Sequence, residues 1–315
     1  MLAVICPGQG SQTPGMLKPW LELDGVADQL ALHSAAAGID LIEHGVESDA
    51  ETIRDTAIAQ PLIVSSGLVA LRALFPTDVD LHSTVTITAG HSVGEFTAAA
   101  VCGALTPEQT LMLVAARGRA MAAAAAAGPD TGMSAILGGD PSEVAAKLAE
   151  LNLVGANING AGQVVAAGTL DDLAQLAEDP PQRARIMPLK VAGAFHTSHM
   201  ESAVAEVRKL ISSMAVRTPD IPLISNANAG LIEAGPELLD HLVTQISSPV
   251  RWDLCQDRLG QAGVTGIIEL APGAVLSGLA RRTLPGVESV ALKTPADLEA
   301  AQDLVRRHAR IGDQT

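Results

Sequence analysis

Apolar positions along the chain form short continuous runs and longer helical repeats, and the two kinds of segment alternate over most of its length. The run at 2–6 stops at a Pro-Gly pair and the run at 84–89 is rich in β-branched residues, so each predicts a buried strand. The longer segments at 61–71 and 106–126 predict buried helices, the second opened by a Thr-Pro-Glu-Gln capping box. Strands that alternate with helices are typical of an α/β protein with a mainly parallel sheet.

The segment at 127–191 has a different rhythm from the rest of the chain. Its pattern predicts strands at 133–137, 153–158, 163–167 and 184–191, with helices at 141–151 and 170–177. This β-α-β-β-α-β order is that of a ferredoxin-like unit. We therefore predict a small ferredoxin-like α+β domain at 127–191, inserted into a large, discontinuous, α/β-hydrolase-like catalytic domain at 1–126 and 192–315. The large domain is expected to resume with helices at 200–214 and 236–246, strands at 222–225 and 266–270, and closing helices.

Composition limits the class of protein. The chain has 315 residues, enough for one large domain that carries a smaller one. We expect no apolar run that approaches the ~20 residues of a membrane span, and the apolar start without a basic leader indicates a strand, not a signal peptide. Cys6, Cys102 and Cys255 lie far apart without C-x-x-C spacing, which suits a reducing cytoplasm and no disulfide. The net charge of −15 argues against a nucleic-acid partner.

Ser92 lies in the string Gly90-His91-Ser92-Val93-Gly94, directly after the β-branched run and before a helix-prone segment at 95–100. This is the G-x-S-x-G nucleophile elbow in the context that it requires, a strand, a sharp turn and a helix. The free N–H groups at the start of that helix face any charge that develops on an attacked carbonyl. A G-x-S-x-G string also arises by chance in such a chain, so the flanking strand and helix are what favour a nucleophilic Ser92.

A nucleophilic serine needs a base, and His196 is the best candidate among the eight histidines. It lies in a Gly-containing loop at 192–197, and loops held by rigid elements often carry catalytic groups. The alternative is an ordinary hydrogen-bonded loop histidine. His199 falls at a helix start, and the side chain of His91 leaves the elbow in another direction.

Arg117 falls on an apolar face of its predicted helix, between Leu113, Val114 and Met121. A buried guanidinium keeps its charge and needs an anionic partner. The position by itself favours an internal salt bridge to an Asp or Glu. The functional alternative is a bidentate clamp for the carboxylate of a substrate.

The sequence does not support a motif for binding a nucleotide cofactor or a metal. The string Gly8-Gln9-Gly10-Ser11-Gln12-Thr13 begins like a dinucleotide fingerprint, but Thr13 stands where the third glycine is needed. The sequence contains no P-loop, no H-E-x-x-H and no EF-hand loop, and its histidines lack metal-ligand spacing. We therefore expect no cofactor and no metal.

Short sequence motifs spread along the whole chain carry a resemblance to a known family. They are Pro7-Gly8-Gln9-Gly10-Ser11-Gln12, Gln60-Pro61, Gly90-His91-Ser92-Val93-Gly94-Glu95, Arg117-Gly118, Asn157-Ile158-Asn159-Gly160, Gly162-Gln163-Val164-Val165, Ala194-Phe195-His196, Gln245, Pro249-Val250, Trp252 and Pro272-Gly273-Ala274-Val275-Leu276. In these strings the chain resembles the malonyl-CoA:acyl carrier protein transacylases of fatty acid synthesis and the related acyltransferase domains of polyketide synthases.

The resemblance implies roles for individual positions. It implies that Ser92 is the acylated nucleophile, that His196 is its base and acid, and that the backbone carbonyl of Gln245 orients His196. It also implies that the backbone N–H groups of Gln9 and Val93 form the oxyanion hole and that Arg117 holds the malonyl carboxylate. Asn157 and Phe195 are implied as pocket residues. Two departures are visible, since Val93 replaces a more usual leucine and Ala271 stands where a glycine often precedes Pro272. The first is harmless if only the backbone N–H acts, and the second lies far from the chemistry.

The resemblance also implies a reaction and partners. We expect ping-pong transfer of a malonyl group from malonyl-CoA to the phosphopantetheine thiol of holo acyl carrier protein through a malonyl-serine, supplying fatty acid synthesis. The carrier in this family is small and strongly acidic. We further expect a cytoplasmic monomer with no nucleic-acid or membrane partner.

Three alternatives remain at this point. The first is a discrete acyltransferase of a polyketide or mycolate pathway, and the second is a serine esterase or thioesterase. The third, a non-catalytic carrier-docking protein, is disfavoured because Ser92, His196 and Arg117 occur together.

Overall fold

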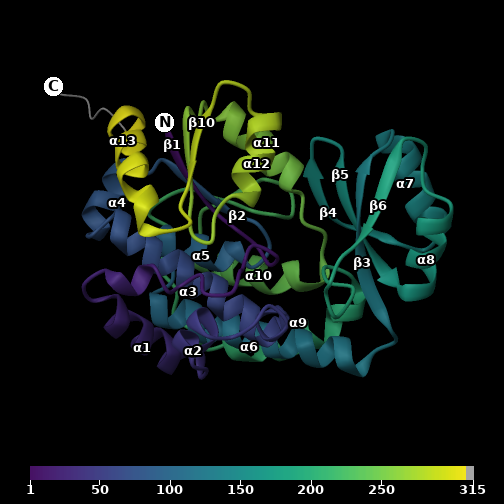
Figure 1. Ribbon diagram of the computed structural model, residues 1–315, viewed down its shortest axis with the longest axis horizontal. Helices are drawn as coiled ribbons and strands as arrows, with labels where there is room; N and C mark the ends of the chain where they lie inside the picture. The colour runs from purple at the N-terminus through teal and green to yellow at the C-terminus, as the bar shows by residue number, and fades with distance from the viewer. Residues whose placement is uncertain (310–315) are drawn as a thin grey trace.

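The larger of two sheets is six-stranded and almost entirely parallel (Figure 1). The protein is described here by a computed structural model covering residues 1–309. The strand order is β10 (Glu288–Ala291), β9 (Gly266–Glu269), β1 (Leu2–Cys6), β2 (Ile87–Gly90), β7 (Leu223–Ile224) and β8 (Leu231–Ile232). All neighbouring pairs are parallel except the edge pair β7 and β8. The predicted α/β fold with a mainly parallel sheet is therefore confirmed.

Helices surround this sheet, and short 3-10 turns connect several of them. The α-helices are α1 (Val26–Ala37), α2 (Leu41–Val46), α3 (Thr56–Leu74), α4 (Asp78–Thr84), α5 (Gly94–Val101), α6 (Pro107–Ala127), α9 (Glu201–Ile211), α10 (Gly235–Thr244), α11 (Trp252–Gln261), α12 (Val275–Thr283) and α13 (Leu298–His308). The 3-10 turns are η1 (Trp20–Glu22), η2 (Thr52–Arg54), η3 (Ser198–Met200), η4 (Gln245–Ser247) and η5 (Pro295–Asp297).

Strand β1 is apolar at every position because both of its faces are buried. Leu2, Val4 and Cys6 pack into the core that contains α1, α3, α5 and α6, whereas Ala3 and Ile5 pack into a second core that contains α11 and α12. Successive side chains of a strand point to opposite faces, so a strand covered on both faces has no polar position to alternate with. In Figure 1 these two groups of helices lie on opposite sides of the sheet.

A second, antiparallel sheet forms from the segment that the sequence set apart. Its order is β4 (Val154–Gly160), β5 (Gln163–Thr169), β3 (Thr131–Gly138) and β6 (Ala184–Pro188), with α7 (Pro141–Glu150) and α8 (Leu170–Glu178) between its strands along the chain. The two helices pack on the sheet through a core of their own, and both appear at the same outer edge of Figure 1. Met133 and Val165, by contrast, pack into the main core. The predicted order of strands and helices in this segment is confirmed.

Helices α3 and α6 are long and apolar enough to cross a membrane by length and composition alone. The expectation that no stretch of this kind exists is therefore wrong. In α3, 78% of the most apolar window is buried inside the protein, and in α6 the share is 50%. Contact between the two helices within the main core accounts for this apolar character without a membrane.

The sequence pattern missed several elements and misplaced some ends. Helices α1, α2, α4 and α11 and strands β8 and β10 were not predicted. Strand β8 has only two residues, and β10 is a partly exposed edge. The predicted strand at 84–89 begins only at Ile87, since Thr77 caps a helix that reaches Thr84. The strand predicted at 184–191 ends at Pro188, after which the chain leaves the sheet toward His196.

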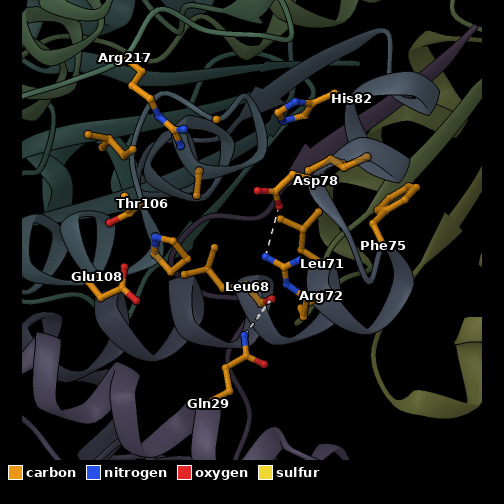
Figure 2. Close-up of a pocket in the computed structure, with 15 residues that line it drawn as sticks. Gln29, Leu68, Leu71, Arg72, Phe75, Asp78, His82, Thr106, Glu108 and Arg217 are labelled. Carbon is orange, nitrogen blue, oxygen red and sulfur yellow. Dashed lines mark hydrogen bonds and ion pairs between the residues drawn. The ribbon is translucent and has the colours of Figure 1, made fainter.

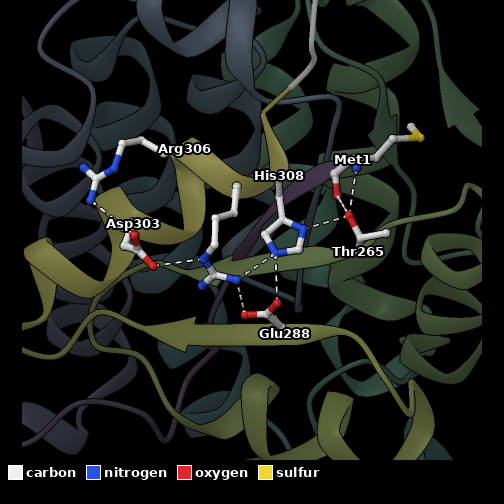
Figure 3. A network of polar contacts seen from close by, with 7 residues as sticks. Met1, Thr265, Glu288, Asp303, Arg306 and His308 are labelled. Atoms are coloured by element: carbon white, nitrogen blue, oxygen red, sulfur yellow. Dashed lines mark hydrogen bonds and ion pairs between the residues drawn. The ribbon is translucent and has the colours of Figure 1, made fainter.

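The start of β1 and the end of α13 meet in one polar network (Figure 3). The N-terminal ammonium donates to Thr265 Oγ1 at 2.9 Å, and His308 Nδ1 lies 2.9 Å from the same oxygen. Glu288 and Asp303 pair with the basic side chains of this helix end. Because the arginine and carboxylate side chains of these pairs are about half exposed, we expect each pair to stabilise the fold only slightly.

Candidate active site

Ser92 lies at the carboxyl end of the parallel sheet, two residues beyond β2, with a φ of 51°. A non-glycine residue in this region is strained, and such strain is typical of a nucleophile elbow. The structure also explains the two glycines of the motif. A Cβ atom on Gly90 would collide with the carbonyl group of Gly94, and a Cβ atom on Gly94 would collide with the carbonyl oxygen of Cys6.

His196 faces the serine. Ser92 Oγ lies 2.7 Å from His196 Nε2, and His196 Nδ1 lies 2.7 Å from the backbone carbonyl oxygen of Gln245. Because that carbonyl only accepts, Nδ1 carries the proton and Nε2 is left as the acceptor for the serine hydroxyl. Burial, assisted by the positive charge of Arg117, lowers the pKa of His196 to about 3. The imidazole is therefore neutral at ordinary pH, which is the state a general base requires.

The other candidate histidines do not contact the serine. His91 Nε2 lies 2.9 Å from Asn159 Oδ1, and the His91 ring meets Trp252 edge-on. His199 lies in η3, where its backbone N–H donates to Thr197 Oγ1. Within residues 1–309 no carboxylate forms a recorded hydrogen bond or ion pair with His196, so the geometry is that of a Ser–His pair oriented by a backbone carbonyl.

Arg117 projects from α6 into the same site and is 1% exposed. Its Nη1 donates to Gln60 Oε1 at 2.7 Å, and its Nη2 donates to Gln245 Oε1 at 3.0 Å and to Ser92 Oγ at 3.3 Å. Among the residues that the structure describes, no Asp or Glu lies within ion-pair distance of it. The internal salt bridge favoured by its position on the helix is therefore wrong.

The guanidinium of Arg117 is only partly satisfied. Its Nε is buried and has no hydrogen-bond partner within residues 1–309. A guanidinium has five N–H donors in a planar fork that matches a carboxylate, and here neutral groups occupy only some of them. The Phe96 ring lies 5.5 Å from the centre of the charge and adds a cation–π contact. The arrangement leaves the cation able to accept an anionic ligand.

Two further side chains support the elbow, and the sequence predicted a role for neither of them. Asn226 Oδ1 accepts the Ser92 N–H at 2.7 Å, and Asn226 Nδ2 donates to the Gly90 carbonyl at 2.6 Å. Glu95 accepts the Asn226 N–H at 2.7 Å and Gln245 Nε2 at 2.9 Å. A signal for Glu95 was present, because it is the one charged residue of the buried helix α5 and ends the string that begins at Gly90. Asn226 gives no such signal, since it follows a two-residue strand.

Gln9 and Val93 lie on adjacent loops. Strands β1 and β2 are parallel neighbours with Cys6 opposite Gly90, so the loops that follow them leave the same edge of the sheet. A hydrogen bond of 2.9 Å from the His91 N–H to the Cys6 carbonyl ties the two loops together. Neither the Gln9 N–H nor the Val93 N–H has a recorded acceptor in the described part of the chain.

A cavity of about 260 Å³ joins these groups. It is lined by Ser92, His196 and Arg117 on one side and by residues of the antiparallel sheet on the other. Asn157 and Phe195 belong to its wall, and the buried Asn157 Oδ1 has no partner within residues 1–309. Of the residues that the resemblance assigned to the site, all but Val93 and Gln245 line this cavity. Val93 directly follows Ser92, and Gln245 contacts both Ser92 and Arg117.

A larger cavity, of about 340 Å³, lies between α3, α4 and the start of α6 (Figure 2). Its Arg72 is already paired with Asp78 at 3.3 Å. Its lining contains no serine, no cysteine and no pair of a nucleophile with a base. Size alone therefore does not identify the reactive site, and the smaller cavity carries the chemistry.

Comparison with known proteins agrees with this geometry. Residues 4–301 match the acyl transferase domain family. The chain is 48% identical over 304 residues to a malonyl CoA-acyl carrier protein transacylase of Mycobacterium tuberculosis, a match that covers 96% of this chain and 100% of that protein.

Solved structures give the same result. The crystal structure of MCAT from Mycobacterium tuberculosis aligns with a TM-score of 0.92 and 46% identity, covering 97% of this chain and 99% of that chain. A malonyl-transacylase in a holo complex with its type II polyketide acyl carrier protein aligns with a TM-score of 0.87 and 26% identity, covering 96% and 99%.

Proposed function

The chain belongs to the acyl transferase domain family, and from this membership we propose that it transfers malonyl groups from malonyl-CoA to the phosphopantetheine thiol of holo acyl carrier protein. The observation that carries the proposal is one cavity in which a Ser92–His196 pair lies beside Arg117, a buried cation with an unpaired N–H. Each half of the proposed substrate has a complementary group there. The thioester needs a nucleophile and a base, and the free carboxylate needs a cation.

The first half-reaction acylates the serine. The Ser92 hydroxyl gives its proton to His196 Nε2 as Oγ attacks the thioester carbonyl carbon. The backbone N–H groups of Gln9 and Val93 would hold the resulting oxyanion, helped by the N-terminus of α5. The carbon–sulfur bond then breaks, the imidazolium returns the proton to the thiolate, and CoA leaves with malonyl attached to Ser92.

The second half-reaction runs the same steps in reverse. His196 takes the proton of the carrier's phosphopantetheine thiol, and the sulfur attacks the malonyl ester. The tetrahedral intermediate collapses, the ester bond to Oγ breaks, and Ser92 recovers its proton from His196. The backbone carbonyl of Gln245 keeps the imidazole ring in the orientation that both half-reactions need.

Arg117 gives the site its selectivity in this proposal. The malonyl carboxylate would take the unpaired guanidinium N–H groups, while Gln60 and Gln245 hold the rest of the fork. An acyl chain without a carboxylate would leave the buried cation without an anion, which costs free energy. Asn157 and Phe195 shape the cavity around the remainder of the acyl group.

We also propose the finer description of the architecture. The six-stranded sheet with the nucleophile at its carboxyl edge supports an α/β-hydrolase-like large domain at 1–126 and 192–315. The antiparallel order β4-β5-β3-β6, with two helices on one face, supports a ferredoxin-like small domain at 127–191.

Partners and location follow as proposals as well. The chain would act as a cytoplasmic monomer, in keeping with three buried cysteines that carry free thiols. The carrier would dock near the cavity opening, where Leu189 and Val275 are exposed apolar side chains. The exposed cations Lys190, next to Leu189, and Arg281 and Arg282, at the far end of the helix that Val275 begins, would meet its acidic surface. The pathway served is proposed to be fatty acid synthesis, with a polyketide pathway as the alternative.

The proposal is tested by intact-protein mass spectrometry. Protein incubated with malonyl-CoA should gain one malonyl group on Ser92, and holo acyl carrier protein added afterwards should remove it and become malonylated. Ser92→Ala, treated in the same way, serves as the control. Loss of the adduct to water at the same rate with and without the carrier would instead indicate a thioesterase.

A further inference from the structure

Glu95 is a buried carboxylate that the transfer chemistry does not use. It is 1% exposed and lies under the elbow, one residue beyond its second glycine. Its oxygens accept hydrogen bonds from the Asn226 N–H and from Gln245 Nε2. A buried carboxylate without a contacting cation is costly, and within residues 1–309 no Lys, Arg or His lies within ion-pair distance of Glu95. The cation that offsets its charge must act from farther away.

That cation is Arg117, and the amide of Gln245 separates the two groups. Gln245 Oε1 accepts from Arg117 Nη2 at 3.0 Å, while Gln245 Nε2 donates to Glu95 Oε2 at 2.9 Å and to the Ser92 carbonyl at 3.0 Å. Burial raises the pKa of Glu95, whereas the Asn226 N–H and the charge of Arg117 lower it toward the ionised state. Both oxygens face N–H donors, as those of an ionised carboxylate do. Burial lowers the pKa of Arg117 to about 9, opposed by the charge of Glu95.

From this geometry we propose that Glu95 is a positioning residue for substrate selection, which acts through the Gln245 amide to hold Arg117 ready for the malonyl carboxylate. The inference rests on the proposed function. Glu95 orients the amide because a carboxylate only accepts hydrogen bonds, so the NH₂ end of Gln245 must face Glu95 and the oxygen must face Arg117.

The separation by one amide has a physical consequence. A carboxylate in direct contact with Arg117 would occupy the guanidinium fork and compete with the substrate. Glu95 instead supplies the opposite charge without taking those N–H groups, and Arg117 Nε stays unpaired. The site thus keeps a stable buried cation whose fork is still available.

Glu95→Gln removes this control with almost no change of shape. Glu95 accepts one hydrogen bond at each oxygen, but a glutamine amide has only one oxygen. Its NH₂ group would then face either the Asn226 N–H or the Gln245 NH₂, and a flip of Gln245 would turn donors toward Arg117. Arg117 would lose both an acceptor and a balancing charge.

The test compares kcat/KM for acylation by malonyl-CoA and by acetyl-CoA in several variants. Glu95→Gln should lower the malonyl value about 10-fold or more, mainly through KM, and change the acetyl value far less. Glu95→Asp, which keeps the charge, should recover part of the malonyl activity. In an Arg117→Ala background, Glu95→Gln should not change the malonyl/acetyl ratio further. Glu108→Gln, on the same helix as Arg117 but lining the other cavity, is the matched control and should leave the ratio unchanged.

Three outcomes would overturn the inference. One is an equal loss for both substrates, which would make Glu95 only a support of the elbow. Another is that Glu95→Gln lowers the malonyl/acetyl ratio of Arg117→Ala as much as it lowers the ratio of the wild type. The third is an unchanged malonyl/acetyl ratio in Glu95→Gln. Circular dichroism checks that each variant folds. If Glu95→Gln does not fold, the malonyl/acetyl ratio of Glu95→Asp is compared with that of the wild type instead. Wild-type protein that malonyl-CoA fails to acylate would refute the proposed function itself, whereas an acylated wild type with an unchanged ratio in Glu95→Gln refutes only the role of Glu95.

Discussion

The two walls of the catalytic cavity are built differently. On the side of the parallel sheet, Ser92 and Arg117 line the cavity, and Glu95, Asn226 and Gln245 lie outside its lining. All five are buried and joined by a continuous set of hydrogen bonds. Polar groups in such a network have little freedom, because each one orients the next. This wall therefore fixes where the reacting atoms lie.

The opposite wall comes mainly from the antiparallel sheet and mixes apolar with polar side chains, with Met133 and Val165 beside Asn157, Asn159 and Gln163. Its polar Asn157 has a buried oxygen without a recorded partner in residues 1–309. Apolar contacts tolerate changes of shape much better than a hydrogen-bond network does. We therefore expect the largest losses from changes to the first wall, including the selectivity that we propose for Arg117, and smaller effects on fit from the other residues that line the cavity.

The largest effect should come from the dyad on the first wall. Ser92→Ala should abolish labelling by malonyl-CoA, and His196→Ala should slow acylation by ~10⁴–10⁶-fold, as in other units of a nucleophile and a base. Rapid-quench mass spectrometry measures both. Near-normal transfer in His196→Ala together with a loss in His199→Ala would mean that the base has been assigned to the wrong histidine.

Arg117 should give the next largest effect, and one that depends on the substrate. Arg117→Ala should lower kcat/KM for malonyl-CoA, with a rise in activation free energy of about 2–5 kcal/mol, the usual cost of losing one partner of a buried charge pair. Activity on acetyl-CoA relative to malonyl-CoA should increase. Arg117→Lys should stay impaired, because one ammonium group cannot replace the planar fork. Steady-state kinetics with both thioesters make the comparison. Unchanged discrimination in Arg117→Ala would return this residue to a purely structural role.

Phe195 should affect which acyl group fits the cavity and should have little effect on the rate of malonyl transfer. Its ring lines the cavity directly before His196, where it would fill the space that an α-methyl group needs. We expect malonyl-CoA to be preferred over methylmalonyl-CoA by about 1–3 kcal/mol, the usual value of one methyl group, and Phe195→Ser to reduce that preference. Competition between the two thioesters measures it directly. Equal specificity constants in the wild type would contradict the steric explanation.

Arg281 and Arg282 lie at the exposed end of α12, away from both walls. Reversing both charges should raise KM for the acidic carrier several-fold and leave acylation of Ser92 by malonyl-CoA unchanged. Added salt should weaken transfer in the parent protein more than in the variant. If these arginines only complement the helix dipole, neither half-reaction will respond, and parallel losses in both half-reactions would point to damage elsewhere.

The smallest expected effect is a pH profile without an acidic limb near neutrality. A general base works in its neutral form, and a lowered pKa keeps it neutral as the pH falls. With the pKa of His196 lowered to about 3, single-turnover acylation should stay nearly constant from about pH 8 to about pH 5. A decline centred near pH 6.5, the ordinary value for histidine, would show that His196 is far more solvated than the structure indicates.

The sequence predicted one part of the molecule better than another, for physical reasons. The elbow was predictable because its glycines are required by close approaches of backbone to backbone, which leave a fixed string. The alternation of strands and helices was equally visible, because β1 and α3 are buried on nearly all sides and carry continuous apolar runs.

The remaining features depend on contacts between distant parts of the chain. Asn226 follows a strand of two residues, yet it reaches the Ser92 N–H across 134 positions. The partners of Arg117 gave a similar difficulty, since its position on a helix indicates burial but not that two glutamines replace the expected carboxylate. No periodic pattern records such contacts, and only the assembled fold brings these groups together.

The most direct test of the account is a crystal structure of the protein after brief exposure to malonyl-CoA. It should contain a malonyl ester on Ser92 Oγ, with the carboxylate bound to Arg117 through Nε and the ester carbonyl oxygen facing the Gln9 and Val93 N–H groups. A malonyl group attached to Ser92 whose carboxylate lies away from Arg117, or one bound with Ser92 unmodified, would contradict it.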